Sequence, residues 1–212
     1  MMPTVVRRLL RVSLVGLAAL STACSVLPQA ESLTYYQLPA TTLTAQQAPA
    51  SHKSLIIQVN RPHAERLLAS SRITVLPQGN ELSAYKGVRW GDDAPAVLRN
   101  RLADALRDAA QFRAVVLDSE SVIADVELGG TLGAFQVEYV QGVPRVRIQF
   151  DALVRDQRSG QLIQTRRFVA QQEVDGTAVP QVVEAFGQAT DALSLQVSQW
   201  LASLTVQANT RK

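Results

Sequence analysis

The chain has 212 residues, of which 47% are hydrophobic and only 5% aromatic, so its core has to be built mainly from Val, Leu, Ile and Ala. Its 21 basic and 18 acidic residues give a formal charge of +3, but Arg7, Arg8 and Arg11 lie in an amino-terminal segment that we expect to be removed, which leaves 18 basic residues against 18 acidic ones. A neutral mature chain excludes the strongly basic surface of a nucleic-acid-binding protein, and a single cysteine excludes a disulfide within one copy.

Residues 1–23 predict a signal peptide of the bacterial lipoprotein type. The three arginines precede an uncharged apolar run over residues 12–20, and small residues then lead directly to Cys24. Such a run is too short to cross a bilayer as a helix, which takes about 20 residues. We expect cleavage between Ala23 and Cys24, a diacylglycerol on the Cys24 thiol and a further acyl chain, such as palmitate, on the freed amine. The alternative is an ordinary secreted protein, cut after Ala23, with one free thiol.

The first half of the mature chain alternates short apolar runs with loops. Residues 24–32 predict a polar, lipidated tether, and residues 33–38 predict a strand that a proline ends. Residues 39–53 are small or polar and lack periodicity, which predicts a loop. The nearly continuous apolar run over residues 54–59 predicts a strand that is buried on both faces.

The next segment predicts a hairpin before the first long helix. Residues 63–70 are compatible with one or two helical turns. Residues 72–76 and 81–85 predict two strands, because a proline and a Gln-Gly-Asn turn separate them. Residues 86–93 then lead into the helix.

A helix is predicted over about 94–111. Asp92 or Asp93 can cap its start, and Pro95 suits the first turn, where its missing N–H is no loss. Apolar residues recur at steps of three and four and form one buried face. The opposite face carries interleaved acids and bases, which indicates a solvated surface: Arg99, Arg101, Asp104, Arg107 and Asp108.

The second half of the chain predicts a meander and a second long helix. After a strand over residues 112–117, three long strands are expected over about 122–140, 143–156 and 161–172, with turns between them. The alternation of apolar residues changes phase near Gly133, which predicts a β-bulge. An apolar stripe predicts a helix over 178–204, followed by a flexible tail over 205–212.

Together these elements predict an α+β fold. The expected architecture is a mixed, mainly antiparallel sheet with a carboxy-terminal meander, packed by the two amphipathic helices at about 94–111 and 178–204. We expect one domain over residues 33–204, preceded by the signal peptide and the tether.

Candidate catalytic and metal-binding residues are scarce. The chain has no G-x-S-x-G, P-loop or HExxH motif, and its two histidines, His52 and His63, have no ligand-like neighbours at metal-binding spacing. Asp92 and Asp93 are better explained as helix caps than as a catalytic pair. Glu81, Asp125 and Asp151 are scattered over predicted strands. We therefore predict no catalytic residue and no metal site.

Tyr85 and Trp90 are the candidate contact residues. They flank a glycine-containing segment next to Lys86 and Arg89, where an exposed Trp could contact a protein partner or lipid head groups. The alternative, which we prefer for Trp90, is that its ring folds over the start of the helix as part of the core.

Several segments in a characteristic order resemble one known family. They are Cys24, residues 35–39 (Tyr-Tyr-Gln-Leu-Pro), 55–59 (Leu-Ile-Ile-Gln-Val), 72–75 (Arg-Ile-Thr-Val), 80–82 (Asn-Glu-Leu) and 89–90 (Arg-Trp). In these residues the chain resembles the ABC-type transport auxiliary lipoprotein family, that is, the PqiC-like and YmbA-like lipoproteins. The resemblance runs from about Tyr35 to about Leu204, which is nearly all of the mature chain.

The resemblance implies a function in transport between membranes. It implies a periplasmic lipoprotein on the outer membrane that accompanies an MCE-type lipid transport system and docks on a membrane-anchored MCE protein. Neither catalysis nor a cofactor other than the covalent lipid on Cys24 is implied, and a homo-oligomer is left open. Ser25, rather than Asp, after Cys24 favours the outer membrane. Two alternatives remain: a periplasmic lipid carrier with its own apolar cavity, and an envelope hydrolase.

Overall fold

The computed structural model describes residues 32–41 and 53–204. The predictions for the signal peptide, for Ala23 and Cys24, for nearly all of the tether and for the tail fall outside these residues, as does most of the predicted loop over 39–53. The folded unit begins at Leu33. Among the residues described, no helix is both long enough and apolar enough to cross a bilayer.

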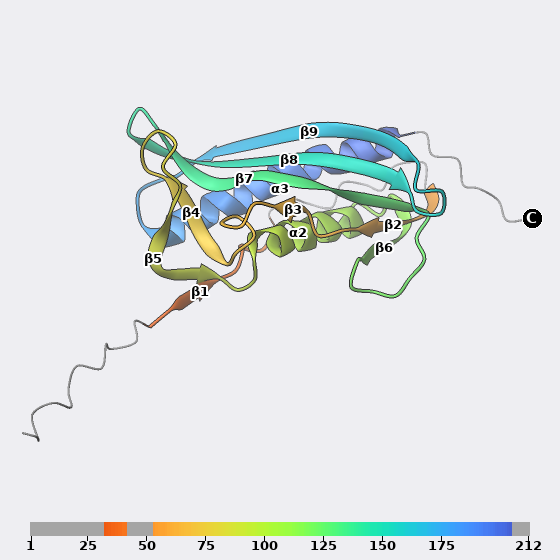
Figure 1. Ribbon diagram of the computed structural model, residues 1–212, viewed down its shortest axis with the longest axis horizontal. Coiled ribbons are helices and arrows are strands. Elements are labelled where there is room, and N and C mark those ends of the chain that lie inside the picture. The colour runs from red at the N-terminus through yellow and green to blue at the C-terminus, as the bar shows by residue number, and fades with distance from the viewer. Residues whose placement is uncertain (1–31, 42–52, 205–212) are drawn as a thin grey trace, which may run out of the picture. The chain divides into compact units, whose positions relative to one another are not determined.

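One open sheet of nine strands forms the framework of the described part of the chain (Figure 1). The strands are β1 (Thr34–Tyr36), β2 (Lys53–Val59), β3 (His63–Ala64), β4 (Arg72–Leu76), β5 (Ser83–Trp90), β6 (Phe112–Leu117), β7 (Val126–Val140), β8 (Val143–Asp156) and β9 (Leu162–Glu173). The path through the sheet is β1-β5-β4-β7-β2-β6, with β8 and β9 continuing from β7. Most paired residues are antiparallel, so the predicted α+β class and mainly antiparallel sheet are confirmed.

Strand β7 is the central strand because it pairs along both edges. One edge meets three shorter parallel strands in turn, β2 at residues 126–128, β3 at 131–132 and β4 at 136–138. The other edge pairs with β8 along almost its whole length, and β8 pairs with β9. The register between β7 and β8 shifts at Gly133, so the predicted meander and bulge are both confirmed.

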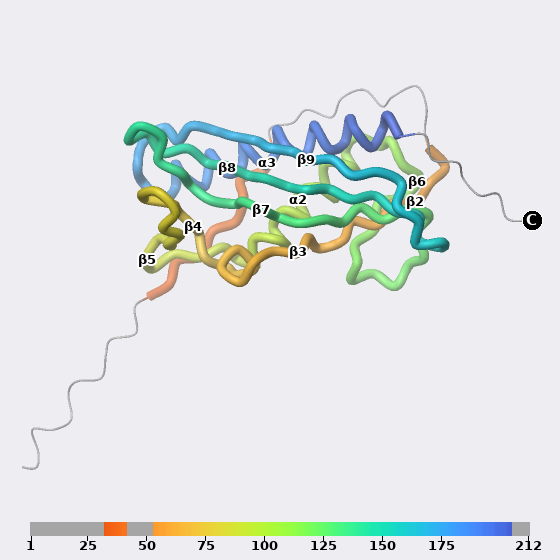
Figure 2. Tube along the Cα trace, turned by 45° about the horizontal axis from the view of Figure 1, so that its top comes forward, coloured from red at the N-terminus to blue at the C-terminus, as the bar shows by residue number. Residues whose placement is uncertain are grey.

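Two helices, α2 (Ala94–Asp108) and α3 (Val179–Ser203), cover one face of the sheet and pack against each other (Figures 1 and 2). Asp93 caps α2 as predicted, because its Oδ1 accepts the N–H of Ala96 at 3.0 Å. Helix α2 ends three residues before the predicted boundary, since Ala110 adopts a left-handed conformation with φ 48°. Helix α3 is one residue shorter than predicted at each end.

An aromatic cluster joins the sheet to helix α3. Trp90 at the end of β5 has an exposed fraction of 0%, and its ring lies 5.1 Å from Phe186 of α3 and 5.9 Å from Phe135 of β7, centroid to centroid. Both pairs are edge-to-face, an arrangement that adds about 1 kcal/mol beyond the burial of the rings. The interpretation of Trp90 as a core residue is therefore correct, and its exposure to a partner or lipid is excluded by burial.

Two local expectations are wrong, and a third is met in part. Strand β5 continues to Trp90 instead of ending at Tyr85, because Gly87 adopts φ 67° and lets the strand bend without breaking. Residues 122–125 precede β7 and are not part of it. His63 and Ala64 form the short strand β3 beside β7, and one helical turn follows within the expected segment 63–70, closed by the N–H of Ala69 donating to the carbonyl oxygen of Glu65 at 2.7 Å.

Strand β2 is less buried than its sequence predicts. Leu55, Ile57 and Val59 are buried, whereas Ile56 and Gln58 on the alternate face are partly exposed. The helices cover one face of the sheet, and the other face of β2 carries polar contacts instead. Burial on both faces of this strand is therefore not observed.

Candidate functional site

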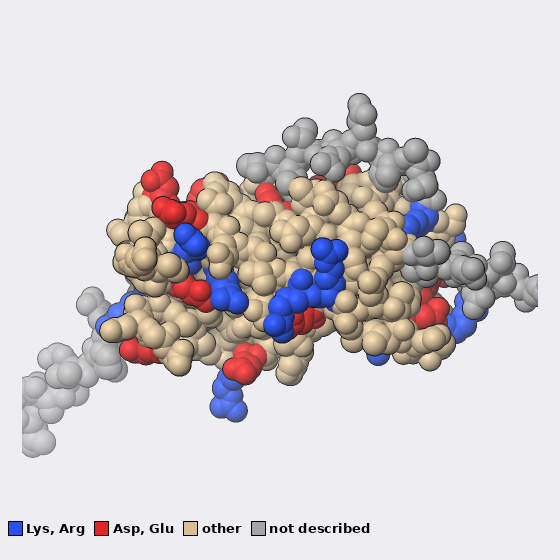
Figure 3. Space-filling view, turned by 90° about the horizontal axis from the view of Figure 1, so that it is seen from above, with Lys and Arg blue, Asp and Glu red and all other residues tan. Residues whose placement is uncertain are grey.

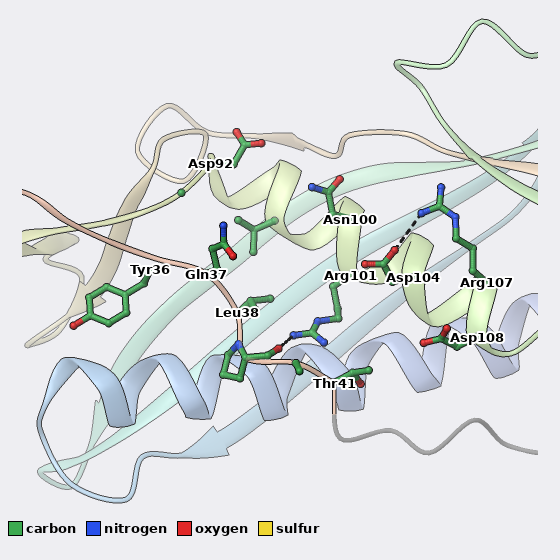
Figure 4. Close-up of a pocket in the computed structure, with 14 residues that line it drawn as sticks. Tyr36, Gln37, Leu38, Thr41, Asp92, Asn100, Arg101, Asp104, Arg107 and Asp108 are labelled. Atoms are coloured by element: carbon green, nitrogen blue, oxygen red, sulfur yellow. Dashed lines mark hydrogen bonds and ion pairs between the residues drawn. The ribbon is translucent and has the colours of Figure 1, made fainter.

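A cleft of about 730 Å³ lies between α2 and the segment 36–41 that follows β1 (Figure 4). Its helix side is formed by polar residues that were expected to face solvent, and its other side by Gln37, Leu38 and their neighbours. The charged lining residues are Asp92, Arg101, Asp104, Arg107 and Asp108. The lining of this cleft thus includes acids and bases in nearly equal number.

Arg101 is the residue that ties this cleft to the second helix. Its Nη1 lies 3.3 Å from Oδ1 of Asp191 on α3, and the exposed side-chain fractions of the two residues are only 11% and 6%. The Arg101 guanidinium also donates to the carbonyl oxygen of Pro39, as Figure 4 shows. The other carboxylate oxygen of Asp191 accepts the Thr41 hydroxyl at 2.9 Å. We call Pro39, Thr41, Arg101 and Asp191 the clasp.

Gly187 of α3 makes room for the clasp. A Cβ at this position would lie 3.0 Å from Cδ of Pro39, tighter than an ordinary van der Waals contact. The proline ring therefore packs directly on the helix backbone. The clasp fastens the segment after β1 into the groove between α2 and α3.

Sequence reasoning missed the clasp. It placed Arg101 on a solvated face with Arg99 and Arg107, whereas the structure buries most of the Arg101 side chain. Asp191 lies 90 positions further along the chain, so no local spacing pairs it with Arg101. The one available signal was an acidic residue inside the apolar stripe of the last helix, a position where a charge requires a partner.

The chemistry of the cleft is that of structural ion pairing. Arg101 is engaged by Asp191, and Arg107 lies 3.1 Å from Asp104 within α2. The residues that line this cleft include no His, Cys, Ser or Lys. Across the described residues, no group of three His, Cys, Asp or Glu side chains is arranged to hold a metal ion. The Thr41 hydroxyl donates to a carboxylate that Arg101 already engages, so the contacts described at this cleft are those of a fastening point.

The other predicted polar residues lie apart from one another. Asp93 caps α2 and also pairs with Arg61 at 2.7 Å, while Asp125 accepts the N–H of Ile56 at 2.8 Å. Asp151 on β8 pairs with Arg167 on β9 at 2.5 Å. His63 is exposed on β3 and His52 lies outside the described residues. The structure brings none of these together into a site.

The sheet face opposite the helices is a polar surface. Cross-strand ion pairs run over it, with Arg155 and Glu127 at 2.5 Å and Arg147 and Glu138 at 3.9 Å. Figure 3 views the molecule from the edge on which β9 lies, not from this face, and basic and acidic side chains lie near one another there. Opposite charges on neighbouring strands stabilise the pairing modestly.

Tyr85 occupies a half-buried position on β5 and contacts Tyr139 of β7. Burial, together with the hydrogen bond and charge interaction with Tyr139, raises the pKa of Tyr85 to about 12. The two phenols link the β4–β5 hairpin to the tip of the β7–β8 hairpin. The prediction that Tyr85 contacts a partner or lipid stays a prediction.

Comparison with known proteins identifies the family. The model of the ABC-type transport auxiliary lipoprotein component matches residues 36–198, which includes all of α2, most of α3 and all strands except part of β1. The chain belongs to this family. The resemblance inferred from the segments between Tyr35 and Leu204 is thereby confirmed. As a member of this lipoprotein family, the chain is an auxiliary component of ABC-type transport.

Solved structures share the fold of the ABC-type transport auxiliary lipoproteins. A crystal structure of a Xanthomonas campestris protein is 25% identical, with a TM-score of 0.71 over 80% of this chain and 95% of that one. A crystal structure of an uncharacterized protein is 20% identical, with a TM-score of 0.63 over 81% and 99%. A Chlamydia trachomatis protein is 6% identical, with a TM-score of 0.52 over 72% and 98%. Among curated proteins, none matches.

Proposed function

We propose that this protein is a non-catalytic auxiliary subunit of an MCE-type intermembrane lipid transport system, held on the periplasmic face of the outer membrane by lipid on Cys24. The observation that carries the proposal is the family match over residues 36–198, which begins twelve residues after a cysteine placed for lipidation. An auxiliary lipoprotein on one membrane needs a partner that spans the gap to the transporter on the other. A membrane-anchored MCE protein is the partner that we expect.

The clasp supports a role in holding position. It ties the segment that follows the tether to α2 and α3, the two helices that cover the sheet. A subunit that links a membrane to a partner protein needs a folded domain that is held at a defined place relative to its membrane anchor. A fastened amino-terminal segment serves that purpose, whereas a freely jointed one would not.

The described cleft disfavours the alternative of a lipid carrier. A lipid tail needs an apolar cavity, and five charged residues line this cleft. Phe135, Phe186 and Trp90 fill the space between the sheet and α3 with ring-to-ring contacts. No observation favours an envelope hydrolase. The adaptor role is therefore the proposal that we carry forward.

Crosslinking in intact cells tests the adaptor role. The full-length protein carrying a carboxy-terminal affinity tag is crosslinked, purified from solubilised membranes and analysed by mass spectrometry. We expect an MCE protein or a permease or ATPase subunit of its transporter to be enriched over a control in which an unrelated outer-membrane lipoprotein carries the tag. Recovery of neither would overturn the adaptor role. Native mass spectrometry of the purified protein, in which bound lipid would appear as added mass, tests the carrier alternative.

A further inference from the structure

Most of the exposed apolar side chains lie at one end of the folded unit, and three others, Val122, Ile123 and Leu162, lie at the opposite end, near the β8–β9 turn. Of the ten large hydrophobic side chains that are exposed among the described residues, six lie on or next to β1 or at the tips of the β4–β5 and β7–β8 hairpins. These six residues, which we call the apolar end, are Leu33, Tyr35, Leu82, Tyr139, Val140 and Val143. Tyr35 is the most exposed of them, at 63%.

The strand pairings bring these residues to the same end. Leu76 of β4 pairs with Glu138 of β7, so the β4–β5 turn, which contains Leu82, lies beside the tip of the β7–β8 hairpin. At that tip Val140 pairs with Val143. Strand β1 pairs with β5, and Figures 1 and 2 both show the start of β1 at the end where the two hairpins lie.

The folded unit begins at Leu33, next to β1 at this end. Only eight residues separate Leu33 from Cys24, and an extended chain covers about 3.5 Å per residue, so the tether reaches at most about 30 Å. A lipid on Cys24 would hold Leu33 within that distance of the bilayer. The apolar end is therefore the part of the fold that this tether keeps near the membrane.

The chemistry of the apolar end suits a membrane interface. Tyrosine is enriched at the level of the lipid head groups because its ring is apolar and its hydroxyl is polar. Two exposed basic residues, Arg72 and Lys86, lie on the adjoining strands β4 and β5, where they can meet lipid phosphates. Each shallowly inserted side chain adds a modest amount of binding energy, so the surface orients an anchored protein and does not replace its anchor.

We propose that the apolar end rests on the surface of the bilayer that holds the Cys24 lipid, with Tyr35, Tyr139 and Val140 at head-group depth. This orientation rests on the proposed lipid anchor. It directs the opposite end of β8, with the β8–β9 turn, away from that membrane and toward a partner. Leu162 at this far end is also exposed, at 55%, and provides a matched position for comparison.

A depth measurement on the anchored protein tests the orientation. Cys24 is the single cysteine, and its thiol is blocked as a thioether once it is lipidated, so a cysteine introduced by Val140→Cys or Leu162→Cys is the single reactive thiol. Each lipidated variant is labelled with an environment-sensitive fluorophore and placed in vesicles of phosphatidylethanolamine and phosphatidylglycerol that contain a head-group quencher. We expect about threefold more quenching at position 140 than at position 162, because only the apolar end would lie at the interface.

Each outcome bears on a different claim. Vesicle-bound protein with equal quenching at both positions, or with more at 162, would overturn the orientation while leaving the anchor intact. Wild-type protein that takes up the thiol label at Cys24 and does not float with vesicles would overturn the anchor and the orientation together. The vesicles contain no transporter subunit, so the adaptor role is not tested by this measurement. In cells, a photo-crosslinking residue at position 140 is expected to capture lipid, and capture of protein alone would make this end a protein interface instead.

Discussion

Arg101 of α2 and Asp191 of α3 form an ion pair of 3.3 Å between the two helices, and both side chains are almost fully withdrawn from solvent. The pair is surrounded by further partners, since the Pro39 carbonyl accepts from Arg101 and the Thr41 hydroxyl donates to Asp191. Removal of one member of a buried pair leaves the other charged and without compensation. Removal of either partner is therefore expected to lower the free energy of unfolding by more than the intact pair contributes.

Replacement of Asp191 by alanine is expected to destabilise the fold severely. Arg101 would remain in the groove without its carboxylate, and we expect the free energy of unfolding to fall by about 3 kcal/mol. Urea denaturation followed by circular dichroism measures the change. Asp104→Ala is the matched control, because Asp104 pairs with Arg107 on the exposed side of α2, and its effect should stay below about 0.5 kcal/mol. Equal effects of the two substitutions would show that the clasp is not a stabilising feature.

Gly130 is expected to tolerate no side chain. It adopts φ 140° in β7, and a Cβ there would lie 2.1 Å from the carbonyl oxygen of Asp151 on β8. Because backbone, and not a flexible side chain, fills the space, Gly130→Ala should cost about 3 kcal/mol or abolish soluble expression. Gly142→Ala is the control for backbone strain without a steric clash, because Gly142 has φ 82° with open space around it. This substitution should lower the free energy of unfolding by about 1 kcal/mol. Thermal unfolding of both variants provides the comparison, and a harmless Gly130→Ala would contradict the β7–β8 register.

Tyr85 is expected to titrate later than a free tyrosine. Burial and the contact with Tyr139 raise its pKa from 10.0 to about 12, so the neutral phenol is favoured in the folded state. Its contribution to stability is complete below pH 10 and is lost as the pH rises through 12. Absorbance at alkaline pH should show a late tyrosine step that Tyr85→Phe removes. The control is Tyr35→Phe, at an exposed position, which should leave the late step in place. A late step that is still present in Tyr85→Phe would contradict its assignment to Tyr85.

Cys24→Ala is expected to release the protein from the membrane. Without the thiol no diacylglycerol can be attached, and the surface contact of the apolar end is too weak to hold the protein alone. Cell fractionation with a carbonate wash should move the protein from the membrane pellet to the soluble fraction. Ser25→Ala keeps the thiol and should remain in the pellet. Retention of Cys24→Ala after the wash would show that the anchor lies elsewhere.

The sequence predicted the parts of the fold that local patterns determine. Alternating Val146, Ile148 and Phe150 with polar residues indicated β8, and the phase change near Gly133 indicated the bulge, because in both cases the signal lies within a few neighbouring residues. The cap at Asp93 followed from a side chain that reaches only three positions ahead. Such features are determined by residues that lie close together in the sequence, so they can be predicted from it.

Long-range features had no such signal. The parallel pairing of β7 with β2, β3 and β4 joins segments separated by more than 60 residues, so no local pattern indicates it. The Arg101–Asp191 pair was hidden because Arg101 looks like Arg107, whose side chain is 40% exposed, when only spacing is considered. The bend at Gly87 likewise hid the continuation of β5 to Trp90, since a glycine usually ends a strand.

The short strand β1 determines where a mechanical load would enter the fold. With Cys24 held in a membrane, any pull reaches the domain at Leu33 and runs along β1, whose three residues pair in parallel with residues 88–90 of β5. A pull along the strand loads its hydrogen bonds in shear, so they resist together instead of opening one by one. The contacts of the clasp come next along the chain, so they would resist the pull after the hydrogen bonds of β1. Removal of β1 and residues 37–41 would leave the pairing of β7, β8 and β9 intact, so we expect this segment to yield first under tension.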